Sequence, residues 1–254
     1  MRIFAPSNQK KKGIAVDYKE LNFQGISAER QWDVSAAFPV LMRKVYVWMT
    51  LALAITGFTA YGVATSPGIL QMIYGSSIVM WGLIIAELAL VIGVSAAINR
   101  LSLTTATLMF ILYSVINGAL LSSIFMIYTA SSIAMVFFIT AGTFGVMALI
   151  GYTTKTDLSS MGKILFMALI GLIIATIVNL FIKSSGLTLI LSYVGVLIFV
   201  GLTAWDTQKI KQMLLQAPDA GEGAQKMALL GALTLYLDFV NLFIYLLRIF
   251  GKRE

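Results

Sequence analysis

Seven long apolar runs follow one another along the chain and constrain its fold more than any other feature. They lie at about 45–66, 77–98, 103–127, 131–152, 163–183, 187–209 and 227–249. Each is close to the roughly 20 residues that a helix needs to cross a bilayer, where backbone polar groups must be satisfied internally. Of the 254 residues, 59% are hydrophobic and 11% are charged. The sequence therefore predicts an all-α polytopic membrane protein, a bundle of seven transmembrane helices.

The basic residues indicate how this bundle is oriented. Residues 1–44 hold eight Lys or Arg and are predicted to form an N-terminal cytoplasmic tail, ahead of a transmembrane domain at 45–251. With the tail inside, most other basic residues also fall in inner loops, as the positive-inside rule requires. The exception is the chain end, where Arg248, Lys252 and Arg253 lie outside if the seventh run crosses. Crossing is favoured over re-entry because the earlier segments already set the orientation.

The chain contains no Cys and no His, which excludes several kinds of site. Disulfides, thiol nucleophiles, His-containing metal sites and Ser-His-Asp triads cannot form. The net charge of +7 comes largely from the tail and loops, so it indicates orientation rather than nucleic-acid binding. We therefore expect no enzyme activity, no catalytic residue, no cofactor and no nucleic-acid partner. Any response to pH must come from carboxylates.

Three carboxylates fall inside predicted spans: Glu87 in the second, Asp206 near the inner end of the sixth, and Asp238 in the seventh. Each costs about 2.5–3.5 kcal/mol at the middle of a bilayer, so such residues face the bundle interior and mark functional sites. Helical spacing gives Asp238 a polar stripe on an otherwise oily helix, made of Gly231, Thr234, Asp238, Asn241 and Tyr245. The sixth run has a similar stripe, made of Ser192, Gly195, Thr203 and Asp206. We expect the two stripes to face each other or a shared wet cavity.

A pair of carboxylates that meet in this way can serve two chemistries. Deprotonated, the pair attracts a hard cation such as Ca²⁺, which takes oxygen ligands. Sharing a proton, the pair can activate water as in an aspartic protease. The alternative is a structural role, in which a basic residue neutralises each Asp; Arg100 and Lys209 lie near the inner ends and could serve Asp206.

A stripe of small residues in the third run predicts close helix packing. Ser114, Gly118 and Ser122 are spaced by four, which places them on one face of a helix. Small side chains let another helix approach closely within a membrane. We interpret this stripe as a packing surface.

Three longer stretches resemble the signatures of the Bax inhibitor-1 family, also called TMBIM or LifeGuard, and of its bacterial branch in particular. They are GLTAWDTQKIK (201–211), GALTLYLDFVNLFIYLLRIFG (231–251) and GYTTKTDLSSMG (151–162). The resemblance implies a seven-helix bundle with the seventh helix at its centre. It also implies a pH-sensitive calcium leak, gated by an aspartate pair that maps to Asp206 and Asp238, with Ca²⁺ as the transported ion rather than a cofactor.

In the family an acidic and a basic residue of the second helix also take part. Glu87 matches the acidic one, whereas Arg100 lies at the helix end with a spacing that departs from the family pattern. Asn241, one turn from Asp238, is a further supporting residue. The bacterial branch implies a multi-pass protein of the cell inner membrane, a monomer whose partners are the lipid bilayer, Ca²⁺ and protons.

Two other functions are alternatives to the calcium leak. Some bacterial relatives lack the aspartate pair and modulate a membrane protease, so this chain could regulate other membrane proteins in stress or cell death. An intramembrane aspartyl protease also needs Asp in two neighbouring helices, but its Gly-x-Gly-Asp and later Pro-Ala-Leu motifs are missing here: Asp238 follows Leu235-Tyr236-Leu237, and no Pro follows Pro218. The residues leave open whether the ion leaks passively or exchanges with protons.

Overall fold

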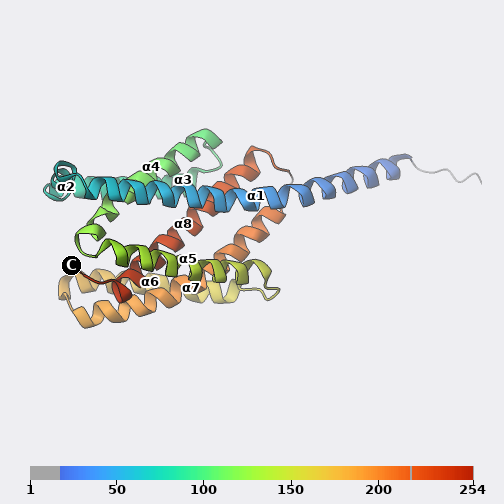
Figure 1. The fold of residues 1–254 in the computed structure, drawn as a ribbon. Coiled ribbons are helices and arrows are strands. Elements are labelled where there is room, and N and C mark those ends of the chain that lie inside the picture. Colours follow the sequence, from blue (N-terminus) through green and yellow to red (C-terminus); the bar gives the residue numbers. More distant parts are fainter. Residues whose placement is uncertain (1–17, 218, 254) are drawn as a thin grey trace, which may run out of the picture.

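The protein is described by a computed structural model that covers residues 18–217 and 219–253, with side chains from Ala37 onward. In chain order its helices are α1 (Tyr18–Ala64), α2 (Pro67–Tyr74), α3 (Ser77–Ala97), α4 (Leu103–Leu121), the 3₁₀ turn η1 (Ser122–Met126), α5 (Ala130–Thr153), α6 (Ser159–Ile182), α7 (Ser185–Leu215) and α8 (Glu222–Phe250). Seven helical segments are long and apolar enough to cross a membrane, α4 and η1 together forming one of them. The predicted all-α polytopic fold is confirmed, and Figure 1 shows the helices gathered into one bundle.

The last helix, α8, lies at the centre of this bundle. Two-thirds (67%) of its most apolar stretch is buried, against 44% for α7 and 6% for α3 and α6. Figure 1 shows α8 running obliquely through the bundle, and it contacts α1, α4, α5 and α7. Because protein rather than lipid surrounds α8, it can carry polar side chains at depth, as the resemblance implied.

The two ends of α8 are tied to opposite ends of the bundle. Near its start, the Glu222 carboxylate accepts the Leu103 N–H at 3.0 Å, where α4 begins. Beyond its end, Lys252 accepts the Thr129 N–H at 3.1 Å, just before α5 begins. The α4 and η1 segment separates these two points along the chain. The seventh run is therefore one uninterrupted helix that crosses the bundle and does not re-enter.

The boundary predicted at residue 44 falls within one continuous helix. Helix α1 already runs from Tyr18, and its apolar part is Ala37–Ala64, so only residues 1–17 of the predicted tail lie outside the described residues. Leu41 and Val45, on either side of the basic pair Arg43 and Lys44, are fully buried. Long basic side chains can extend away from a buried helix face. Lys44 does so and donates to Gln225 Oε1 at 2.9 Å.

The short connections contain structure that apolar periodicity did not predict. The eight-residue helix α2 fills the link between the first two spans, with Pro67 at its first position, where the missing N–H costs nothing. In the loop before α6, the Asp157 carboxylate accepts the Ser159 N–H at 2.9 Å. Hydrogen bonds from the Ser159 hydroxyl and backbone hold the pKa of this exposed carboxyl below its ordinary value of 3.8.

Candidate functional site

A cavity of about 440 Å³ lies between α6, α7 and α8, and both predicted aspartates line it. Asp206 comes from α7 and Asp238 from α8. The α8 residues that line the cavity are Thr234, Leu237, Asp238, Asn241 and Tyr245, and therefore include four of the five predicted stripe residues. The fifth, Gly231, packs against Ile210 of α7, with its added-Cβ position 3.0 Å from that side chain. The structure thus brings Asp206, Asp238 and Asn241 to one place. This cavity is called the acidic cavity below.

Both carboxylates of the acidic cavity are buried. Asp206 is 7% exposed and Asp238 is 5% exposed. The Asp238 Oδ2 atom is buried and has no hydrogen-bond partner within the described part of the chain. A buried oxygen in this state costs free energy unless a proton, water or cation satisfies it. The carboxyl group of Asp238 is therefore left available for a ligand.

Nearby polar side chains use their donors on their own helices. The Thr234 hydroxyl donates to the Leu230 carbonyl at 3.1 Å. The Asn241 amide donates to the Leu237 carbonyl at 2.8 Å. Such bonds to the preceding turn are common for these residue types in membrane helices. As a result the Asn241 side-chain oxygen remains available as an acceptor beside the two carboxylates.

Neither Lys209 nor Arg100 forms an ion pair with Asp206. Among the described residues, the one salt bridge joins Lys226 and Glu222. Lys209 lines the acidic cavity, but its Nζ lies over the Trp205 ring, 5.0 Å from the ring centroid. Arg100 is exposed in the turn after α3 and does not line the cavity. The structure thus places Arg100 outside the site, at a helix end where a single basic side chain reaches water.

Tyr245 marks one end of the acidic cavity. Its ring packs directly on Gly195 of α7, where an added Cβ would approach the ring to 2.7 Å, and it stacks on Phe199 with centroids 5.9 Å apart. Beyond it lies a second cavity of about 470 Å³, which Arg248 and Arg253 line together with polar side chains of α6 and α7. Arg248 also lies 5.4 Å from the Tyr245 ring centroid. The Tyr245 ring therefore contacts Arg248 of the basic cavity on one side and lines the acidic cavity on the other.

Glu87 belongs to a different polar cluster, on another side of α8. It accepts a hydrogen bond from the Asn117 amide of α4. Asn117 in turn accepts from the Tyr236 hydroxyl at 2.9 Å, and that hydroxyl lies 2.6 Å from the Thr56 hydroxyl of α1. The Thr56 hydroxyl also lies 3.0 Å from the Ser114 carbonyl, so its single proton alternates between this carbonyl and Tyr236. This chain of polar groups, called the Tyr236 network below, joins α1, α3, α4 and α8.

The small-residue stripe of the third run makes the Tyr236 network possible. A Cβ added to Gly118 would lie 2.5 Å from the Thr56 carbonyl, so α1 and α4 touch backbone to backbone at this point. The stripe therefore does act as a packing surface, as predicted from its spacing. Sequence reasoning missed Thr56, Asn117 and Tyr236 as partners of Glu87. The available signal was the polar Asn117 within the small-residue face of the third run.

Two carboxylates alone make an incomplete metal site. The described residues contain no group of three or more Asp, Glu, His or Cys placed to hold a metal ion. Ca²⁺ takes six to eight oxygen ligands. Two aspartates, the Asn241 oxygen and water can attract such an ion, but they provide few protein ligands with which to retain it. The arrangement suits transient cation binding rather than storage.

Comparisons with known proteins agree with the resemblance seen in the sequence. Residues 39–254 match the family described as "Inhibitor of apoptosis-promoting Bax1". The chain is 51% identical over 220 residues to "Inner membrane protein YbhL" of Escherichia coli K12, which covers 86% of this chain and 94% of that protein. It is 47% identical over 213 residues to an uncharacterized protein of Borreliella burgdorferi, covering 84% and 92% of the two chains. The chain belongs to the Bax inhibitor-1 family of integral membrane proteins.

Proposed function

We propose that this protein conducts Ca²⁺ or a similar cation through the membrane, with Asp206 and Asp238 as the cation site and the pH-sensitive gate. The observation that carries the proposal is that both aspartates are buried in one cavity, where Asp238 Oδ2 has no partner among the described residues. A structural carboxylate in a membrane helix is expected to be paired or hydrogen-bonded. A carboxylate that must accept and release a cation is expected to remain available.

The proposed response to pH follows from the same two groups. With both carboxylates ionised, the cavity carries two negative charges that repel each other and attract a divalent cation. A proton taken up by the pair removes one of these charges. Proton and cation therefore compete for one site. Because no His exists in the chain, this pair is the structure's means of sensing pH near neutrality.

Calcium flux into proteoliposomes tests this proposal directly. Flux would be measured between about pH 6 and pH 8 for the wild type, Asp206→Asn, Asp238→Asn and the double variant, since a coupled pair can titrate in this range. We expect each single variant to lose most of the pH dependence and the double variant to lose no more. Asp157→Asn is the matched control, because that carboxyl is exposed in a loop and should leave flux unchanged. Absence of flux from folded wild type, or equal behaviour of all variants, would refute the proposal.

The second candidate is a regulator of other membrane proteins, which the family description favours because it names an inhibitor of an apoptosis-promoting protein. Such a role needs a protein-binding surface rather than the acidic cavity. A cellular phenotype that survives the Asp206→Asn and Asp238→Asn double variant would support regulation over ion conduction. Cleavage of a helical reporter peptide that depends on Asp238 would instead revive the aspartyl protease hypothesis.

A further inference from the structure

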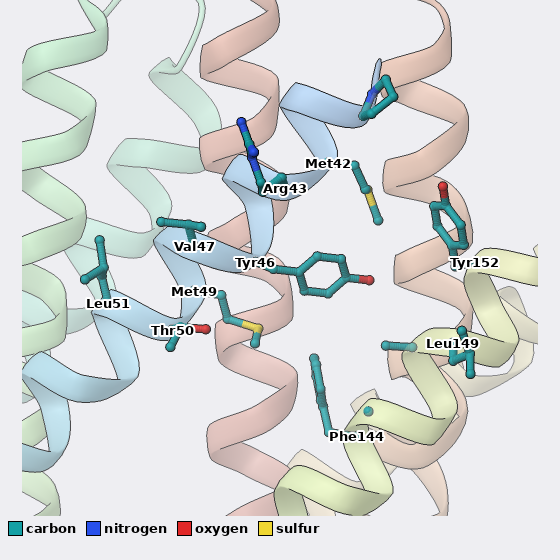
Figure 2. A pocket seen from close by; sticks show the side chains of 13 residues that line it. Met42, Arg43, Tyr46, Val47, Met49, Thr50, Leu51, Phe144, Leu149 and Tyr152 are labelled. Carbon is teal, nitrogen blue, oxygen red and sulfur yellow. The ribbon is translucent and has the colours of Figure 1, made fainter. Parts of the chain in front are cut away.

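A larger hollow lies between α1 and α5, where the aspartates do not reach. Its volume is about 820 Å³. Its lining residues are Pro39, Met42, Arg43, Tyr46, Val47, Met49, Thr50 and Leu51 of α1 and Phe144, Gly145, Ala148, Leu149 and Tyr152 of α5. Figure 2 shows Met42, Tyr46 and Met49 of α1 directed toward α5, while Arg43, Val47 and Leu51 extend along the opposite edge of α1. This hollow is called the α1–α5 groove below.

The groove opens toward the membrane. Met49 and Phe144 lie buried at its floor, while Leu51 and Leu149 are more than half exposed along its rim. At Gly145 an added Cβ would meet no atom within 4 Å, so the groove is empty space above the α5 backbone. Both helices are membrane-crossing segments. An apolar space at this depth holds little water and is covered by lipid or by another protein.

The groove is polar at one end and apolar at the other, as a phospholipid is. In Figure 2 Arg43 and Tyr152 lie in the upper part of the view and Leu51 and Phe144 lie lower, with the Tyr46 hydroxyl between the two helices. From Arg43 to Leu51, eight residues along α1, the distance is about 12 Å at 1.5 Å per residue. A basic residue and tyrosines at the membrane–water boundary, above an apolar slot, are typical of residues that contact lipid headgroups.

The charge at the polar end is positive. Arg43 lines the groove, and the Lys211 ammonium donates to the Tyr152 carbonyl at 2.7 Å while lying 5.0 Å from the Tyr152 ring centroid. None of the described lining residues is acidic. The one ion pair among the described residues lies elsewhere, between Lys226 and Glu222, so Arg43 has no carboxylate partner among them. An anionic group from outside the described chain is the complementary ligand.

A second copy of the chain fits this groove less well than a lipid does. Asp206 and Asp238 are buried, Glu87 is bonded to Asn117, and the exposed Glu222 at the start of α8 is already paired with Lys226 of its own chain. The described spans of a neighbouring copy would therefore bring no unpaired carboxylate to Arg43. An anionic phospholipid brings a phosphate together with an acyl chain, and so matches both ends of the groove.

We propose that the α1–α5 groove binds one anionic phospholipid, its phosphate at Arg43 and one acyl chain along Leu51 and Phe144. The polar end of the groove lies near the start of the first span and the end of α5. The lipid therefore belongs to the leaflet on the N-terminal side of the membrane. This site is independent of the acidic cavity and of the ion conduction proposed above.

Native mass spectrometry of the purified full-length protein tests the proposal, with phosphatidylglycerol and phosphatidylcholine as probes. We expect one tightly held lipid and a preference for phosphatidylglycerol. Arg43→Gln should reduce that preference about fivefold, the equivalent of roughly 1 kcal/mol for one basic residue at an anionic lipid. Gly145→Leu should fill the open space and prevent binding of both lipids.

Two variants serve as controls for this test. Gly142→Leu adds the same side chain to the same helix, at a glycine that is equally open but does not line the groove. Lys163→Gln removes an exposed positive charge elsewhere. Both should bind lipid as the wild type does. Unchanged binding in Gly145→Leu would overturn the site, and an unchanged lipid preference in Arg43→Gln would overturn the phosphate contact. A dimer that Gly145→Leu dissociates would replace the lipid by a second copy.

Discussion

The Tyr236 network offers a prediction whose size follows from the structure. In Tyr236→Phe the ring keeps its edge-on contacts with Phe110 and Tyr113, at centroid distances of 5.8 and 5.7 Å. Only the hydroxyl is lost, and with it the hydrogen bonds to Thr56 and Asn117. Side-chain hydrogen bonds in membrane proteins contribute about 0.6 kcal/mol on average and up to about 1.7. Two such bonds predict a loss of about 1–3 kcal/mol in the free energy of unfolding.

Thermal unfolding in detergent is the assay for this loss. At about 2–4 °C per kcal/mol for a chain of this size, Tm should fall by roughly 2–12 °C. Tyr193→Phe is the matched control, because Tyr193 is 53% exposed on the lipid-facing side of α7 and should leave Tm unchanged. In Asn117→Ala the Tyr236→Phe change should cost less, since the partner is already gone. Equal Tm values for Tyr236→Phe and wild type would refute the view that this network stabilises the bundle.

Three further predictions concern the acidic cavity and the loop before α6. Gly162→Ala should destabilise the protein by about 1–3 kcal/mol, because its Cβ would overlap the Trp205 ring, which lines the acidic cavity; denaturation in detergent measures this. Tyr245→Ala should speed the labelling of Asn241→Cys by an impermeant thiol reagent added on the Arg248 side, in a chain with no other Cys. Because hydrogen bonds lower the pKa of Asp157, its contribution to stability is present above pH 3.8 and lost as pH falls through the lowered pKa; Asp157→Asn should therefore lower Tm near neutrality but not in strong acid.

The predictions for Gly162 and Tyr245 each have a matched control. Gly171→Ala changes a glycine of the same helix where the added Cβ meets nothing within 4 Å, and it should leave stability unchanged or slightly higher. Tyr245→Phe keeps the ring on Gly195 and should leave labelling slow. Fast labelling with the intact Tyr245 ring would mean that this ring does not close the acidic cavity.

The bundle could be predicted from sequence because each of its spans satisfies one simple physical requirement. A run of about 20 apolar residues must be helical in a bilayer, whatever its neighbours are. The polar stripe on the seventh run also indicated a face of α8 that lines a cavity, where Asp238 and Asn241 lie, but it did not indicate that the apolar faces of α8 are buried as well. These inferences depend on how each residue interacts with the surrounding lipid, and the local sequence determines that interaction.

Contacts between distant helices were harder to predict. The family pattern implied that Glu87 and Arg100 support the aspartate pair, yet the Glu87 carboxylate bonds to Asn117 while Arg100 is exposed in a turn. Apolar periodicity does not give the rotation of one span relative to another, and that rotation decides which side chains meet. The contact of the Lys44 side chain with Gln225 of α8 is a further one that composition alone does not contain.

Helix α8 carries two polar systems, the Tyr236 network and the acidic cavity, on different faces. Tyr236 and Asp238 are two residues apart, so they point about 200° from each other around a helix with 3.6 residues per turn. The Tyr236 side is fully satisfied by partners on α1 and α4, whereas the Asp238 side leaves Oδ2 without one in the described chain. Satisfied polar groups hold a helix in one orientation, while an unsatisfied group is stabilised by whatever ligand reaches it. The Tyr236 network can therefore keep α8 fixed while the charge of the acidic cavity changes, which a proton-sensitive cation site at the centre of a bundle requires.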